Sequence, residues 1–174
     1  MKICMVGNAG VGKTCILNRI KYDDEGMLDN ITPTYYANCA YLQMNNGEAM
    51  LWDTAGEEKF RSLAPIYYRM CDACIIVFDA NDIDSLKAVP RWYEDIRKVV
   101  ECKVYVVMNK VDLCPNSLPL DTARQICKEI GVEEVHTVSA RTGLGIRDFF
   151  EKVLLPSAEV VEEVITMSKK GCLC

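Results

Sequence analysis

Four short polar segments each follow an apolar stretch, and the first has the residue types of a phosphate-binding loop. Residues 7–14 read GNAGVGKT, which matches the pattern G-x-x-x-x-G-K-[ST] between a strand-like run and a helical pattern. In such a loop the glycines let successive backbone N–H groups point at a phosphate, and the following helix adds partial positive charge at its start. We expect Lys13 to reach the β- and γ-phosphates and the Thr14 hydroxyl to bind Mg²⁺. The phosphate-binding residues predicted here are Gly10, Val11, Gly12, Lys13, Thr14 and Cys15.

The second segment, residues 53–56 (DTAG), has the residue types to sense the metal and the terminal phosphate. Asp53 follows a strand-like run, and its carboxylate can hold Mg²⁺ through water because that ion gives up its hydration shell reluctantly. The backbone N–H of Gly56 can donate to a γ-phosphate oxygen, which would make the conformation of the next segment depend on the triphosphate. Taken alone, Asp53 is equally compatible with an ordinary polar residue at the end of a strand.

The last two segments, residues 109–112 (NKVD) and 139–141 (SAR), can read a purine base. The Asp112 carboxylate can accept two hydrogen bonds from guanine, whereas adenine offers neither donor and would leave that carboxylate unpaired. Asn109 can tie this loop to the phosphate loop, and the stem of Lys110 can pack over the purine. The backbone N–H of Ala140, between Ser139 and Arg141, can donate to the guanine O6 atom. The four segments together predict a guanine-nucleotide site, and the base-reading pair argues against the alternative of a phosphate-loop kinase or ATPase.

Composition limits the remaining possibilities. The chain has 174 residues, half of them apolar, and a net charge of −5, so it suits one globular domain and argues against nucleic acid as a partner. The first residues lack the pattern of a signal peptide, and no apolar run approaches the length of a membrane span. We therefore expect a cytoplasmic monomer with reduced thiols. Cys71 and Cys74 form a C-x-x-C pair, but the absence of a second pair gives a zinc site little support.

Continuous apolar runs at residues 3–6, 74–78 and 104–108 are typical of strands buried on both faces of a parallel sheet. A short last strand is expected at 135–138, and the Asn-Asn-Gly sequence at 45–47 predicts a hairpin that makes one strand antiparallel. Between the strands, helical spacing predicts helices over 84–100, over 121–130 with Gly131 ending it, and from 146 onward. Ser85 or Asp84 would cap the first of these, and Pro90 would lie inside it.

This alternation predicts an α/β fold with three layers, in which ligands bind at the carboxyl ends of the parallel strands. All four polar segments follow such strand ends, so the pattern of elements agrees with the proposed chemistry. We expect one domain over residues 1–156 and a helical extension with a tail over residues 157–174. Whether residues 157–168 pack on the domain or lie on a membrane is left open, although packing is favoured.

These motifs make the chain resemble the Ras superfamily of small GTPases over nearly its whole length. Residues 62–69 (SLAPIYYR) and the ending GCLC resemble the Rab family in particular. The resemblance implies a P-loop NTPase fold, with a six-stranded mixed sheet and helices on both faces. It also implies a GTP/GDP switch that hydrolyses GTP and regulates vesicle traffic, with an exchange factor, a GTPase-activating protein, a GDP-dissociation inhibitor and effectors as partners. Effectors would read an aromatic patch of Trp52 with Tyr67 or Tyr68, although Trp52 is equally compatible with core packing.

Two departures from the family pattern concern the catalytic centre. The family's usual glutamine after the Asp-x-x-Gly segment is Glu57 here, which can accept a hydrogen bond but cannot donate one. We expect Glu57 and Lys13 to be the catalytic residues, with hydrolysis slowed by the carboxylate; the alternative is a nucleotide-binding adaptor with negligible hydrolysis. The Mg²⁺ ligand present only with GTP is either Thr32 or Thr34, and the spacing to Gly47 favours Thr34.

Two further departures concern the base. No aromatic residue occupies the place where the family stacks one against guanine, and Met27 or Leu28 is the available substitute. Arg141 replaces the usual lysine, which should be tolerated because that contact is made by the backbone.

The C-terminal residues Cys172 and Cys174 match the C-x-C ending that receives two geranylgeranyl groups in the Rab family. They do not form a C-a-a-X sequence, because no cysteine is fourth from the end. Two lipid chains give stable anchoring where one is marginal. The resemblance therefore implies a cytoplasmic protein that cycles onto the cytosolic face of intracellular membranes.

Overall fold

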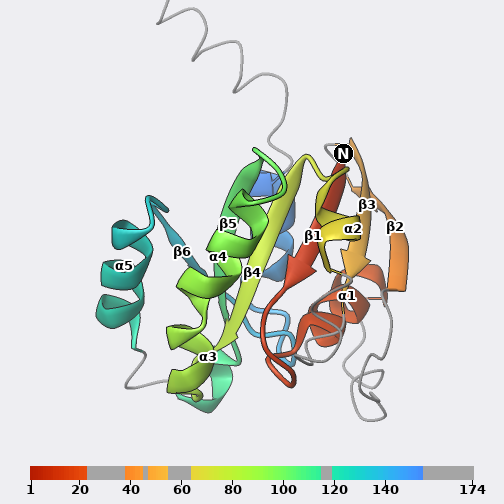
Figure 1. The fold of residues 1–174 in the computed structure, drawn as a ribbon. Coiled ribbons are helices and arrows are strands. Elements are labelled where there is room, and N and C mark those ends of the chain that lie inside the picture. Colours follow the sequence, from red (N-terminus) through yellow and green to blue (C-terminus); the bar gives the residue numbers. More distant parts are fainter. Residues whose placement is uncertain (23–37, 45–46, 55–63, 115–118, 155–174) are drawn as a thin grey trace, which may run out of the picture.

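The computed structural model describes residues 1–22, 38–44, 47–54, 64–114 and 119–154. Their strands form a six-stranded sheet in the order β2-β3-β1-β4-β5-β6 (Figure 1). The strands are β1 (Lys2–Val6), β2 (Asn38–Met44), β3 (Gly47–Asp53), β4 (Ala73–Asp79), β5 (Lys103–Asn109) and β6 (Val135–Thr137). The helices are α1 (Lys13–Tyr22), α2 (Ala64–Tyr68), α3 (Ile83–Lys87), α4 (Val89–Arg97), α5 (Leu120–Glu129) and α6 (Ile146–Asp148), the last continued by a π-helical segment, Phe149–Leu154.

The sheet is parallel except for β2, which pairs antiparallel with β3 from Asn38–Asp53 to Met44–Gly47. This antiparallel pairing agrees with the antiparallel strand that the sequence at 45–47 predicted. The predicted six-stranded mixed sheet is therefore confirmed, and the continuous apolar strands are central because both of their faces are covered.

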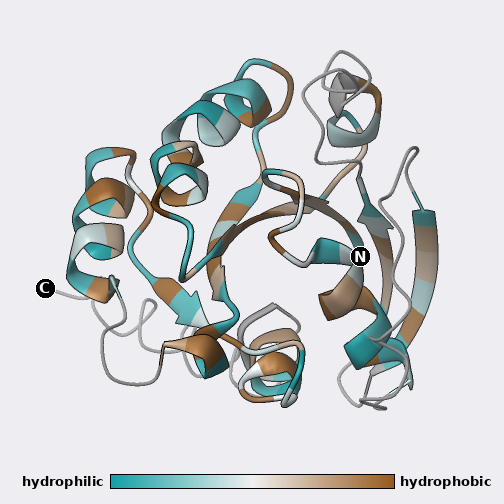
Figure 2. Ribbon diagram, turned by 90° about the horizontal axis from the view of Figure 1, so that it is seen from below, coloured by the Kyte–Doolittle hydropathy of each residue, from teal (hydrophilic) through white to brown (hydrophobic). Residues whose placement is uncertain are grey.

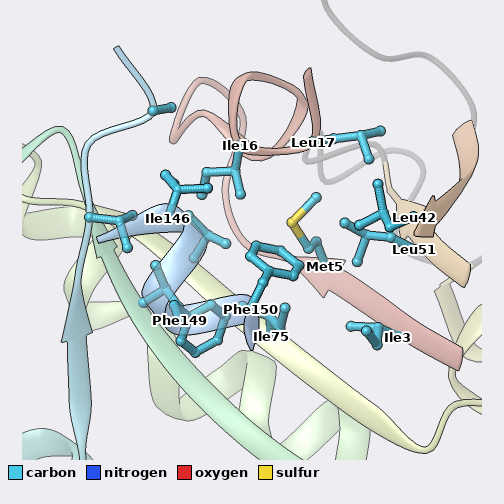
Figure 3. Packing of buried hydrophobic residues seen from close by; sticks show 14 of the residues in the cluster. Ile3, Met5, Ile16, Leu17, Leu42, Leu51, Ile75, Ile146, Phe149 and Phe150 are labelled. Atoms are coloured by element: carbon cyan, nitrogen blue, oxygen red, sulfur yellow. The ribbon is translucent and has the colours of Figure 1, made fainter. Parts of the chain in front are cut away.

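Alternate residues of each central strand enter two separate cores. On β1, Ile3 and Met5 face the side covered by α1 and the helical segment after β6, and Figure 3 shows Met5 beside Phe150 in this cluster. Cys4 and Val6 face the other side, which α2, α3, α4 and α5 cover. Figure 2 shows helices on both sides of the curved sheet. The two cores hold the sheet rigid between helical layers, so the loops at its carboxyl edge are presented from a fixed frame.

The prediction of a single helix over residues 84–100 is wrong. The structure has two helices, α3 and α4, and Pro90 lies in the first turn of α4. A proline is tolerated there because the first N–H groups of a helix have no intrahelical acceptor. The expected caps Ser85 and Asp84 are also wrong, since the Asp82 carboxylate accepts from the backbone N–H groups of both.

The other expected elements differ less. Helix α5 ends beside Gly131, which has a φ of 77°, the left-handed conformation that favours glycine after a helix. The last strand ends at Thr137, one residue before the predicted end. No helix among the described residues is long and apolar enough to cross a membrane.

The C-x-x-C pair lies in the core rather than at a loop. Cys71 and Cys74 are buried with Cys4 in the cluster beneath α2 and α4, and the Cys74 sulfur lies 3.7 Å from that of Cys102. Within the described ranges, no group of three or more histidine, cysteine or acidic side chains is placed to hold a metal ion by itself. These thiols therefore serve as small apolar side chains of the core.

Candidate guanine-nucleotide site

The loops that follow β1, β5 and β6 lie together with the end of β3 at the lower edge of the sheet in Figure 1. The phosphate loop leaves β1 at Gly7, whose φ is 138°, and a Cβ there would lie 2.1 Å from the Val77 carbonyl oxygen. Gly12 has a φ of 96°, and a Cβ there would lie 2.4 Å from the Asn109 amide nitrogen. Both glycines are required by backbone conformation and by close approach, so the loop can pass tightly between β4 and the base-reading loop.

Lys13 is held inside the phosphate loop. Its ammonium donates to the carbonyl oxygens of Gly7 and Asn8, each at 2.9 Å, and only 6% of the residue is exposed. Burial lowers the pKa of Lys13 to about 8, and the nearby Asp53 carboxylate partly opposes that shift. The arrangement keeps a cation inside the loop against two carbonyl oxygens, where a bound anion would neutralise it.

Thr14 and Asp53 come together from α1 and β3. The Thr14 hydroxyl donates to an Asp53 carboxylate oxygen at 2.6 Å, and Asp53 is fully buried. The Thr54 hydroxyl, one residue on, donates to the Met5 carbonyl at 2.7 Å and so fixes the end of β3 against β1. A hydroxyl and a carboxylate are hard oxygen ligands of the kind Mg²⁺ prefers, and that ion takes its remaining ligands from water and phosphate. The donor set therefore fits Mg²⁺.

Asn109 joins three loops through one buried side chain. Its amide N–H donates to the Val11 carbonyl at 2.9 Å, and its amide oxygen accepts from the Ala140 N–H at 3.1 Å. The side chain is 1% exposed, so both bonds lie away from water. The phosphate loop and the two base-reading loops are thus connected directly. The Ala140 N–H, which we expected to meet guanine O6, is bound to Asn109 in this structure.

Asp112 lies on the 3₁₀ turn after β5, Val111–Leu113, and accepts from the Ser139 hydroxyl at 2.6 Å. That hydroxyl also accepts from the Thr142 N–H at 3.1 Å. Ser139 therefore orients the carboxylate from the neighbouring loop, and Arg141 is exposed beside it.

Asp79 and Asn81 are residues of the site that the sequence reasoning missed. Lys110 has a φ of 64°, and its ammonium lies 2.7 Å from Asp79, so the two side chains form an ion pair. Burial alone would raise the pKa of Asp79, but hydrogen bonds from Lys110 and Asn81 outweigh it and hold that pKa below its usual value. The available signal was that Asp79 directly follows the strand predicted at 74–78, just as Asn109 follows the one predicted at 104–108. In the structure, β4 pairs with β5 so that Asp79 lies beside Asn109.

Several predicted residues fall outside the described ranges. They are Thr32, Thr34, Gly56, Glu57, Cys172 and Cys174, together with Met27 and Leu28. Of the aromatic residues, Trp52 contacts Tyr67 with ring centroids 5.5 Å apart, whereas Tyr68 is fully buried. Tyr67 is therefore the tyrosine that can share a surface with Trp52.

Comparison with known families agrees with this geometry. Residues 2–158 match the model described as the Ras family. The chain belongs to the Ras family. This Ras-family chain is similar to Ras-related protein Rab-31 of Homo sapiens and of Rattus norvegicus, each 32% identical over 160 residues covering 88% of the chain and 80% of the relative. It is also 29% identical to GTP-binding protein YPT52 of Saccharomyces cerevisiae over 185 residues, which cover 87% of the chain and 79% of that protein.

These matches place this Ras-family member with the Rab-like small GTPases, as the sequence predicted. It is accordingly a GTP hydrolase that binds GTP and GDP.

Proposed function

We propose that this Rab-like GTPase binds Mg²⁺ and GTP between the loops joined by Asn109 and hydrolyses GTP to GDP and phosphate. The alternation between its GTP-bound and GDP-bound states would regulate vesicle traffic. The buried Asn109 side chain carries the proposal, because it holds the phosphate loop and the base-reading loops in one unit. Asp112 would accept from guanine N1–H and the 2-amino group, with Ser139 holding its orientation. Adenine would leave that carboxylate unpaired.

Charge on the phosphates would be balanced by groups already in place. Lys13 would exchange its bonds to loop carbonyls for bonds to β- and γ-phosphate oxygens, and the loop N–H groups would surround the β-phosphate. Thr14 and Asp53 would hold Mg²⁺, Asp53 through water, with Thr34 as a further ligand in the GTP state. Bound there, Mg²⁺ would neutralise charge that develops on the phosphate oxygens.

The test of this function is the nucleotide that the purified chain carries. Denaturing the purified protein should release GDP or GTP, which mass spectrometry identifies. In a competition assay, unlabelled GDP should displace labelled GDP, whereas ADP at the same concentration should not. Single-turnover cleavage of bound GTP should then yield GDP and phosphate. Equal competition by ADP would exclude the guanine assignment.

Glu57 is proposed to orient the attacking water by accepting a hydrogen bond from it. Unlike a glutamine, its carboxylate cannot also donate a hydrogen bond to the phosphoryl group that is transferred. We expect Glu57→Gln to raise the intrinsic rate of GTP cleavage in single-turnover measurements. Equal rates would show that Glu57 lies away from the chemistry. No described residue favours the alternative of an adaptor with negligible hydrolysis, and family membership favours the enzyme.

Substitution can show which threonine, Thr32 or Thr34, is the Mg²⁺ ligand of the GTP state. Thr34→Ala should weaken GTP more than GDP in the presence of Mg²⁺, because the proposed ligand acts only in the GTP state, while Thr32→Ala should affect the two nucleotides equally. The reverse outcome would assign the role to Thr32.

Membrane attachment is proposed to follow from geranylgeranylation of Cys172 and Cys174. The same assignment implies an exchange factor, a GTPase-activating protein, a GDP-dissociation inhibitor and effectors as partners. In cell fractionation, Cys172→Ser with Cys174→Ser should move the chain from membranes to the cytosol. A doubly substituted chain that stays on membranes would exclude this anchor.

A further inference from the structure

A tryptophan from α4 reaches the phosphate loop across 84 residues of sequence. The indole N–H of Trp92 donates to the side-chain oxygen of Asn8 at 3.0 Å, and Trp92 is 6% exposed. An indole N–H can only donate, so a buried one needs an acceptor such as this amide oxygen. Helix α4 begins near the lower edge of the sheet, where the phosphate loop also lies (Figure 1).

The position of Trp92 is fixed by the core and not by the loop. Val89, Trp92 and Ile96 form the buried stripe of α4, and all three belong to the cluster on that face of the sheet. A ring anchored in this way cannot follow the loop if the loop moves, because the core around it is close-packed. The Trp92 donor is therefore a fixed point to which Asn8 attaches.

Asn8 is held from two sides. Its side-chain oxygen accepts from Trp92, and its backbone carbonyl accepts from the Lys13 ammonium at 2.9 Å. Its neighbour Gly7 is confined by the Val77 carbonyl. Asn8 is thus the residue at which the hydrogen bonding of Lys13 meets a contact from outside the phosphate loop.

We infer that Trp92 is a positioning residue for nucleotide binding: through Asn8 it holds the phosphate loop in the conformation that receives the phosphates. The inference rests on the proposed function, since it concerns the same nucleotide. Trp92 contacts no reacting atom in this scheme and acts on the site through Asn8. Removing its donor leaves the half-buried Asn8 amide oxygen without that partner in a loop that must stay preorganised, and we expect GDP to dissociate about tenfold faster.

The experiment uses four variants of the full chain. They are Trp92→Phe, which keeps a buried ring without the donor, Asn8→Ala, the double variant of these two, and Ile96→Val as a control in the same stripe. Each protein is loaded with radiolabelled GDP and Mg²⁺, and dissociation is followed after adding excess unlabelled GDP. Thermal unfolding is measured alongside. We expect Trp92→Phe and Asn8→Ala each to speed dissociation about tenfold, and the double variant to be no faster than Asn8→Ala. Ile96→Val should lose stability without changing the rate.

Several results would overturn the inference: an unchanged rate in Trp92→Phe or in Asn8→Ala, effects that multiply in the double variant, or equal acceleration by Ile96→Val. A wild-type chain that holds no guanine nucleotide would instead defeat the proposed function, so the two failures are distinguishable.

A spectroscopic measurement covers the case in which Trp92→Phe does not fold. The sequence has two tryptophans, so Trp52→Phe leaves Trp92 as the only one. In that background the emission should shift when EDTA removes Mg²⁺ and GDP leaves, and Asn8→Ala should abolish the shift. Emission that is unchanged on GDP release, or a shift that persists with Asn8→Ala, would count against the tether.

Discussion

Asn109 connects the phosphate loop to the base-reading loops only because Gly12 leaves room for it. The Asn109 amide nitrogen lies where a Cβ on residue 12 would approach to 2.4 Å, and its bond to the Val11 carbonyl passes beside that position. One missing methyl group is therefore what allows the two halves of the site to meet.

Gly12→Ala should weaken GDP binding by about ten- to a hundredfold, because the new Cβ displaces the Asn109 amide and breaks a buried hydrogen bond. Competition against labelled GDP measures the change. The matched control is Gly131→Ala, which also has a positive φ, of 77°, but no atom within 4 Å of the added Cβ, and which lies outside the four motifs. That control should lose about 1 kcal/mol of stability and keep the wild-type affinity. Equal affinity losses in both variants would mean that backbone strain alone is responsible.

Asp112→Asn should reverse the preference of the base-reading loop. The NH₂ group of the new asparagine can donate to the 2-carbonyl of xanthine. Against guanine it would face the 2-amino group, so two hydrogen-bond donors would oppose each other. We expect GDP affinity to fall about a hundredfold, since charge-assisted bonds are lost, and xanthosine diphosphate to bind better than GDP. The Ser139 hydroxyl can still donate to the amide oxygen, so the loop should be retained. Competition among GDP, xanthosine diphosphate and ADP checks this, and an unchanged preference for GDP would remove Asp112 from base recognition.

At the scale of elements, the sequence was informative where one face or both faces of an element are uniformly apolar. The runs at 3–6, 74–78 and 104–108 are strands within a residue at each end, because only burial on both faces produces such runs. The break between α3 and α4 escaped prediction because the apolar spacing continues through residue 88. Periodicity records which face is buried and not whether the backbone is continuous.

The candidate site also has parts that the sequence could predict and parts that it could not. The phosphate loop and the NKVD segment could be placed from sequence because their residues are close together and their chemistry is local. The Lys110–Asp79 ion pair and the Trp92–Asn8 bond could not, since each joins separate elements whose proximity depends on sheet register and helix packing. Tertiary neighbours of this kind leave no spacing pattern in one chain.

Pro90 offers a direct measurement of where α4 begins. Pro90→Ala should change the free energy of unfolding by less than about 1 kcal/mol, because the first turn of a helix needs no N–H from that residue. A proline inside a continuous helix would instead cost about 3 kcal/mol, and its replacement would be strongly stabilising. Urea denaturation measures the difference, with the fully buried Ile96→Ala as a reference that should cost about 2–5 kcal/mol. A gain of several kcal/mol for Pro90→Ala would mean that α3 and α4 form one strained helix.

At the scale of the whole molecule, the site belongs to no single layer. The phosphate loop joins β1 to α1 on one face, Trp92 comes from α4 on the other, and Asp53 ends β3 between them. A ligand whose site depends on all of these groups binds only when both cores are formed around the sheet. Nucleotide binding should therefore stabilise the fold as a unit.

Thermal unfolding should show this linkage with guanine selectivity. A ligand at a hundred times its dissociation constant adds about 2.7 kcal/mol, which for a domain of this size raises the unfolding midpoint by about 5–10 °C. We expect that rise with Mg²⁺ and GDP added to nucleotide-free chain and almost none with ADP. Thr14→Val, which keeps the shape of the side chain but loses the hydroxyl that contacts Asp53, should reduce the rise and its dependence on Mg²⁺. Equal rises with GDP and ADP would contradict base recognition, whereas a full rise in Thr14→Val would contradict the metal site alone.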